Sequence, residues 1–238
     1  MLKKIAVLAE ELDLPIHCHV HETVAEIEHG LAQHGVRPFE RLRRMGVVGP
    51  RLIAVHCVHM DGIELDTMAR EGVAVAHCPS SNLKLASGIA PVAGMRERGI
   101  GVGVGTDGAA SNNRLDVLAE MRMAALLAKV SSGDAGRVSA ADCLEMATLQ
   151  GARALGLDDR IGSIAAGKSA DLAAVELSSV ETLPCFDPVS HLAYAAGREH
   201  VTHVWVEGRA RLLDRALEGI DEEDLRDKAR WWAKRLSP

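Results

Sequence analysis

Four short apolar runs recur in the first half of the chain, and each ends in a side chain that can exchange a proton or bind a metal. The runs are continuously apolar rather than alternating, as expected of strands covered on both faces. Helical patterns separate them at intervals of about 20–30 residues, which indicates a parallel sheet with crossover helices. Because ligands gather at the carboxyl ends of parallel strands, we expect the four terminal side chains at one edge of the sheet. They are His19, His56, His77 and Asp107.

The segments between and after these runs predict the remaining organisation. From about residue 160 the sequence pattern changes from that of helices to that of short strands and turns. Within this part Glu207-Gly208 predicts a hairpin between 201–206 and 209–213. We therefore predict a first unit over 1–158, a small β unit over 159–215 and an amphipathic helix within 216–238. The earlier helices are expected over 2–12, 23–34, 89–98, 114–130 and from Ser139, with Asp142 in a capping box, to near Gly156.

Composition excludes several classes of protein. The chain has 238 residues, 47% of them hydrophobic, and a net charge of −6 with no basic patch, so nucleic acid and anionic membrane are not expected partners. Aromatic residues make up only 3%, which argues against platforms for stacking bases. No apolar run approaches the ~20 residues that span a bilayer. Five scattered cysteines without a CxxC pair indicate reduced thiols and a cytoplasmic location.

The histidines are concentrated near the N-terminus, since eight of the eleven precede residue 78. Side chains alternate along a strand, so His17, His19 and His21 would share one face if 16–21 were extended throughout. A lone strand histidine is more often a satisfied core group than a ligand. Three in five residues, followed by Glu22, favour a site for zinc or iron, which imidazole commonly binds.

The other strand ends carry weaker signals. His56 alone is equally compatible with a core residue and a catalyst. A zinc site made of His77 and Cys78 is a weak hypothesis, because adjacent residues rarely bind one ion. The polar residues Ser80, Ser81 and Asn82 are interpreted as bracing their loop in preference to lining a substrate site.

The segment 103–108 literally fits GxGxxG, yet it is a poor dinucleotide fingerprint because Asp107 would sit among the amides meant for a pyrophosphate. We favour a strand whose glycines allow close packing and which delivers Asp107 to the rim. There the carboxylate can bind a metal and deprotonate a water. No GxSxG elbow or P-loop supports nucleophilic catalysis or phosphate binding.

Four segments together resemble the second half of an amidohydrolase-superfamily barrel. The most similar branch is the aminohydrolases that include TRZ/ATZ-type hydrolases and 5′-methylthioadenosine/S-adenosylhomocysteine deaminases. The resemblance implies an α/β fold with strands five to eight of a TIM-like (β/α)8 barrel, followed by part of a small β-sandwich, entered near 162–172, and a C-terminal helix. The four segments are His19–Thr23, Val55–His59, His77–Leu85 and Gly105–Asn113.

The resemblance also implies roles for individual residues. His19 would be a metal ligand, and Glu22 would contact substrate and carry a proton to a ring nitrogen. His56 would orient the attacking water, and Asp107 would bind the metal, contact substrate and act as base. The cofactor would be one divalent ion, zinc with iron as the alternative. The reaction would be hydrolytic deamination of an adenosine-type thioether nucleoside or related N-heterocycle, with release of ammonia.

One departure keeps alternatives open. The family places an HxH pair of ligands on strand one, whereas the HxxET register and the short distance to Asp107 place His17 and His19 on strand five. A second hypothesis is therefore a catalytically incomplete fragment that acts only with an N-terminal barrel half. A dinucleotide-binding protein is a remote third. The expected partners are a small N-heterocyclic substrate and that missing half, with homo-oligomerisation left open.

Overall fold

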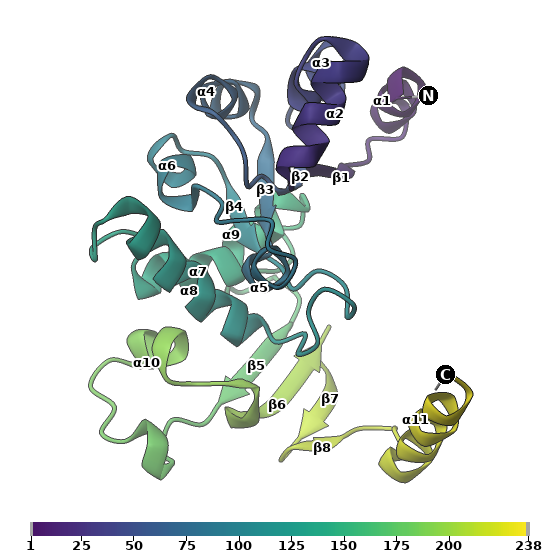
Figure 1. The fold of residues 1–238 in the computed structure, drawn as a ribbon. Helices are drawn as coiled ribbons and strands as arrows, with labels where there is room; N and C mark the ends of the chain where they lie inside the picture. The colour runs from purple at the N-terminus through teal and green to yellow at the C-terminus, as the bar shows by residue number, and fades with distance from the viewer. Residues whose placement is uncertain (1, 237–238) are drawn as a thin grey trace.

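A computed structural model describes residues 2–236, and its centre is an open parallel sheet (Figure 1). The four strands are hydrogen-bonded in chain order and all run in the same direction, as predicted. Val20 pairs with His56 and His77 with Val104, so the strand ends that carry chemistry share one edge. The strands are β1 (Ile16–Val20), β2 (Leu52–His56), β3 (Ala74–His77) and β4 (Val102–Val104).

Helices cover the sheet and close its core. Leu52, Val75 and Val102 are fully buried on the sheet and belong to one apolar cluster with Met68 and Met121 from the helices. The helices that connect or follow the strands are α1 (Leu2–Glu11), α2 (Val24–His34), α3 (Pro38–Arg44), α4 (Gly62–Glu71), α5 (Pro79–Lys84), α6 (Val92–Glu97), α7 (Val117–Ser132), α8 (Ala140–Ala147) and α9 (Leu149–Ala154).

The segment 139–156 contains two helices where the sequence predicts one. The predicted capping box of Ser139 and Asp142 begins α8, but Thr148 leaves the helical region at φ −131° and ψ −92° and separates α8 from α9. The break allows α9 to approach β4: a Cβ on Gly103 would lie 3.0 Å from the Cα of Gly151. The glycine run therefore serves close packing, as expected.

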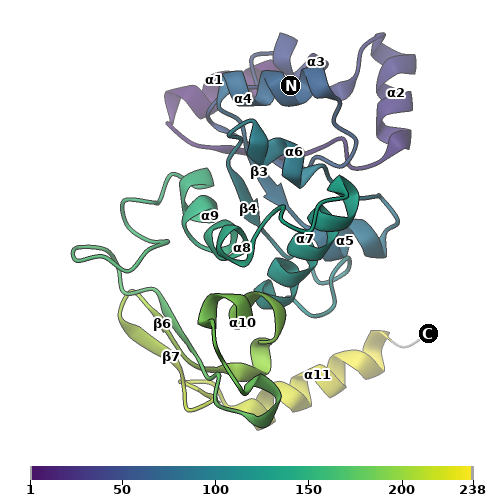
Figure 2. The ribbon, with the colours of Figure 1, turned by 90° about the vertical axis from the view of Figure 1, so that its left-hand side faces the viewer.

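A second, antiparallel sheet follows in the order β5-β6-β7-β8. The predicted hairpin is present, because Glu207 and Gly208 both have positive φ, the conformation of a two-residue turn of this kind. Helix α10 (Pro188–Tyr194) packs on α7 and α8, beside this sheet (Figure 2). The strands are β5 (Leu172–Val175), β6 (Val201–Val206), β7 (Arg209–Leu213) and β8 (Ala216–Leu217), with 3-10 turns at Val180–Thr182 and Arg198–His200.

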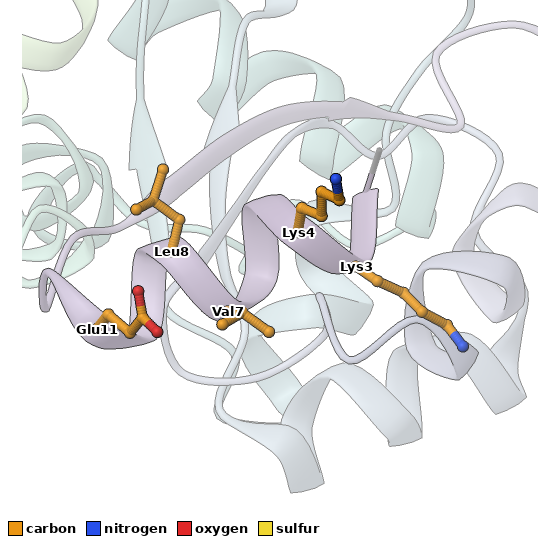
Figure 3. Close-up of a pocket in the computed structure, with 5 residues that line it drawn as sticks. All are labelled: Lys3, Lys4, Val7, Leu8 and Glu11. Carbon is orange, nitrogen blue, oxygen red and sulfur yellow. The ribbon is translucent and has the colours of Figure 1, made fainter.

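The chain ends in α11 (Glu222–Leu236), which is exposed along its whole length and extends away from the sheets (Figure 1). No helix within residues 2–236 is long and apolar enough to cross a membrane. A shallow pocket on α1 is lined by one helix alone and contains none of the predicted site residues (Figure 3). The barrel assignment of the parallel sheet and the boundaries at 158 and 215 stay predictions.

Candidate functional site

The carboxyl edge of the parallel sheet has a strained backbone. His21, His56 and Asp107 have φ angles of 50°, 69° and 59°, although none is a glycine. Each such conformation costs on the order of 1–3 kcal/mol and persists only where the surroundings enforce it, most often at functional sites. Three of them at the ends of β1, β2 and β4 mark this edge as the candidate site.

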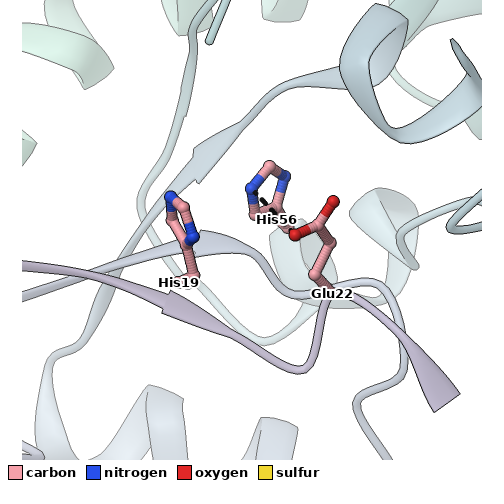
Figure 4. Close-up of side chains that lie close together, drawn as sticks. All are labelled: His19, Glu22 and His56. Atoms are coloured by element: carbon pink, nitrogen blue, oxygen red, sulfur yellow. Dashed lines mark ion pairs between the residues drawn. The ribbon is translucent and has the colours of Figure 1, made fainter. Parts of the chain in front are cut away.

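His19, Glu22 and His56 come together there (Figure 4). One potential ligand atom from each lies within 4.8 Å of the others. The imidazole rings of His19 and His56 are 5.0 Å apart, and His56 Nε2 lies 3.7 Å from Glu22 Oε2. His19 is exposed, Glu22 is half-buried and His56 is buried, so the cluster is open on the His19 side.

His56 is oriented by Asn82. The Nδ1–H of His56 donates to Asn82 Oδ1 over 2.8 Å, and Asn82 itself is buried. The lone pair of a neutral His56 is then on Nε2, facing the Glu22 carboxylate. Nε2 of His56 and the Glu22 carboxylate are both hydrogen-bond acceptors, so a cation or a shared proton between them would stabilise the pair. Two imidazoles and a carboxylate are also ligands that suit zinc.

Hydrogen bonds fix both the side chain and the backbone of Glu22. Ser87 Oγ donates to Glu22 Oε1 over 3.1 Å, and Ser87 is buried. The backbone amides of His21 and Glu22 both donate to the carboxylate of Glu26, at 3.1 and 2.9 Å. Glu26 lies in the first turn of α2, so the helix fixes the chain as it leaves β1.

Two serine hydroxyls bond the same oxygen of the Asp107 carboxylate. Ser81 Oγ and Ser111 Oγ both donate to Oδ2, each over 2.6 Å. Burial alone would raise the pKa of Asp107, but the bonds from Ser111 and Ser81, the Gly108 amide and nearby His56 lower it to about 2. Asp107 is therefore ionised at neutral pH. It lies outside the close His19 group, on the same edge of the sheet.

His21 does not join His19, so the interpretation of 16–21 as uninterrupted strand is wrong at its last residue. Strand β1 ends at Val20, and the positive φ of His21 ends the alternation. The His21 ring is buried, accepts from the Phe39 amide over 3.0 Å, and lies 3.4 Å from Glu64. Arg37 pairs with the same Glu64 at 2.8 Å, so this histidine serves the packing behind the site.

His77 is enclosed without a hydrogen-bond partner for either ring nitrogen among the described residues. Burial, with a smaller contribution from His56, lowers its pKa to about 4, so the ring is neutral at pH 7. Burial also raises the pKa of the Cys78 thiol to about 12. The two residues belong to no potential metal group within 2–236, which leaves the zinc hypothesis for this pair without support.

Ser80, Ser81 and Asn82 lie in the short helix α5 where the sequence predicts a loop. The bonds of Ser81 to Asp107 and of Asn82 to His56 agree with the bracing interpretation of these two residues. Three further residues were not singled out from the sequence: Glu26, Ser87 and Glu120. Glu26 follows Thr23 by three residues, and Thr23 Oγ1 accepts from its amide, so a helix-capping pattern was present as a signal. Ser87 and Glu120 act over long separations in sequence that no local pattern reveals.

Comparison with known proteins gives consistent results over the whole chain. The sequence profile of the Amidohydrolase family matches residues 1–211. The chain is 42% identical over 238 residues to the 5-methylthioadenosine/S-adenosylhomocysteine deaminase of Teredinibacter turnerae, covering 99% of this chain and 53% of that protein. It is 45% identical over 237 residues to the 5′-deoxyadenosine deaminase of Methanothermobacter thermautotrophicus, covering 100% of this chain and 55% of that protein. The chain thus spans about half the length of the curated relatives it matches.

Solved structures are also similar to this chain over nearly its whole length. An adenosine deaminase from Xanthomonas campestris with bound zinc superposes with a TM-score of 0.97 at 48% identity, over 98% of this chain and 53% of that one. The atrazine chlorohydrolase from Arthrobacter aurescens TC1, complexed with zinc, superposes with a TM-score of 0.91 at 28% identity, over 97% of this chain and 51% of that one.

Proposed function

The chain belongs to the amidohydrolase family, and from this premise we propose that it serves in the hydrolytic deamination of an adenosine-type nucleoside or related N-heterocycle, with release of ammonia. The observation that carries the proposal is the cluster of His19, Glu22 and His56 beside an immobilised, ionised Asp107 at the carboxyl edge of the sheet. The names of the relatives, which are deaminases of adenosine-type compounds, support the substrate class.

One divalent ion, zinc in preference to iron, would be held by His19 and by the carboxylate of Asp107. The fit rests on the donor set, because an imidazole and an ionised carboxylate are ligands that suit zinc and both residues lie at the carboxyl edge of the sheet. When bound, such an ion lowers the pKa of water toward about 7 and so supplies the nucleophile at neutral pH.

The chain's own residues would perform the proton transfers. Asp107 accepts a proton from the attacking water, while His56 Nε2 orients that water. Glu22, held by Ser87, donates a proton to the ring nitrogen of the substrate, which makes the adjacent carbon electrophilic. Water adds to that carbon, and Asp107 passes the proton it took from the water to the exocyclic amine. The C–N bond then breaks to give ammonia and the oxo product, and the added hydroxyl returns its proton to Glu22.

We further propose that β1–β4 are strands five to eight of a (β/α)8 barrel and that β5–β8 form part of a small β-sandwich. Both outer strands of the parallel sheet, β1 and β4, have only one neighbour among the described residues. Unpaired parallel edges favour aggregation unless they are covered. The match covers only 53% of the first relative, and we propose that further strands would pair with these edges.

An assay of ammonia release tests the proposal. The protein is loaded with zinc and offered 5′-methylthioadenosine, S-adenosylhomocysteine and 5′-deoxyadenosine. Asp107→Ala is expected to abolish turnover and reduce zinc content, whereas Asp159→Ala, an exposed control, leaves both unchanged. Full activity of Asp107→Ala would overturn the assignment. Turnover by the 238-residue chain alone would exclude the alternative that an added N-terminal half is required.

A further inference from the structure

Glu120 is a buried carboxylate that the proposed reaction does not use. It lies on α7 and is 1% exposed. Among residues 2–236 no lysine or arginine forms an ion pair with it; its hydrogen-bond donors are the backbone amide of Ser80, at 2.9 Å, and Asn112 Nδ2, at 2.6 Å. Burying a carboxylate without a cation is costly, so these two bonds must offset a substantial desolvation penalty.

The two donors adjoin the two hydroxyls that hold Asp107. Ser80 precedes Ser81 in the connection after β3, which contains the short helix α5, and Asn112 follows Ser111 in the connection after β4. These two connections, residues 79–84 and 105–113, are called the two loops below. Asn112 Nδ2 also donates to the carbonyl oxygen of Thr106, over 2.9 Å, immediately before Asp107. The Glu120 carboxylate on α7 therefore contacts both loops, beside the two serines that bond Asp107.

We propose that Glu120 is the positioning residue of Asp107: it sets the separation of the two loops so that Ser81 and Ser111 both reach Oδ2. The catalytic consequence of this arrangement rests on the function proposed above, but the positioning itself does not. A second tie between the loops, from Lys84 Nζ to Ala110 O and Asn113 Oδ1, is exposed and open to competition from water. The buried tie is the one that fixes the geometry.

Glu120→Gln tests the proposal, because the amide offers an N–H where the carboxylate offers a second acceptor. Hydrogen exchange is expected to accelerate in 79–84 and 105–113 and to stay unchanged in β1 and β2. Glu145→Gln is the matched control: Glu145 is also a helix glutamate that accepts side-chain hydrogen bonds, but it does not contact these loops. Unchanged exchange in the two loops, or equal acceleration throughout the chain, would overturn the proposal.

Measurements of zinc binding and kinetics distinguish a positioning role of Glu120 from a general contribution of this residue to the stability of the fold. Glu120→Gln is expected to weaken zinc binding and lower kcat by about 10–100-fold at unchanged KM. Combined with Ser81→Ala, its effect on zinc affinity should be less than additive, since both variants release the same carboxylate; full additivity counts against the proposal. If Glu120→Gln does not fold, Asn112→Ala removes one of the same bonds from the other side. If the wild-type protein neither binds zinc nor turns over, the proposed function fails while the exchange experiment still decides this one.

Discussion

Asn82 Oδ1 lies 2.8 Å from His56 Nδ1, and both residues are buried. This hydrogen bond places the proton on Nδ1 and leaves Nε2 to face Glu22. We predict that Asn82→Ala lowers kcat by about 10–100-fold, the usual effect of removing the partner that orients a functional histidine, with KM unchanged. Steady-state ammonia release measures both constants.

Asn113→Ala is the control for this variant, because within residues 2–236 Asn113 Oδ1 accepts only from the exposed Lys84. Asn82→Asp, which keeps an acceptor toward Nδ1, should retain more activity than Asn82→Ala. Equal kcat for Asn82→Ala and the wild-type protein would show that the orientation of His56 does not depend on Asn82.

Glu22 is the group assigned to protonate the substrate, and its replacement should affect the chemical step most directly. Glu22→Gln keeps an oxygen for Ser87 but carries no transferable acid proton. We predict a fall in kcat of about 10²–10⁴-fold, the typical contribution of a general acid. Glu28→Gln, at an exposed position of α2, controls for the loss of a charge. A Glu22→Gln protein with more than about a tenth of wild-type kcat would remove Glu22 from this role.

His77 makes stability depend on pH. Burial lowers its pKa in the folded state from 6.5 to about 4. Between these values the unfolded chain binds a proton that the folded chain does not, so the free energy of unfolding falls as the pH is lowered through this window. The full loss is about 3 kcal/mol at 1.36 kcal/mol per pKa unit. Urea unfolding at a series of pH values should show a flatter dependence for His77→Gln than for His29→Gln, an exposed control. Equal slopes would refute the assignment.

Local sequence patterns predicted one part of the fold. Apolar runs predicted strands that end at His56 and His77, where β2 and β3 end, and Glu207-Gly208 predicted the hairpin, since these signals lie within a few residues. The end of β1 was missed because the conformation of His21 is imposed by distant groups, the Phe39 amide and Glu64.

The same distinction holds in the site. His19, His56 and Asp107 were predicted from their places after apolar runs and Glu22 from its place beside the histidines, whereas the residues that orient them come from remote segments. Ser87 is 65 residues from Glu22, and Glu120 is 40 from Ser80. Such contacts depend on the order of the strands, which a single sequence determines only through the complete fold.

Close packing of β4 on α9 gives the last prediction. A Cβ on Gly103 would lie 3.0 Å from Cα and 3.3 Å from N of Gly151, which are backbone atoms that cannot turn aside. Gly103→Ala should therefore push α9 from the sheet and lower the free energy of unfolding by about 1–3 kcal/mol, the usual cost of overpacking. Urea unfolding at neutral pH measures the change. Gly62→Ala is the control, because Gly62 begins α4 and a Cβ there would meet nothing within 4 Å, so the substitution should be neutral or slightly stabilising. If Gly103→Ala unfolded at the same urea concentration as the wild-type protein, β4 and α9 would have to be less tightly packed than the glycine pair indicates.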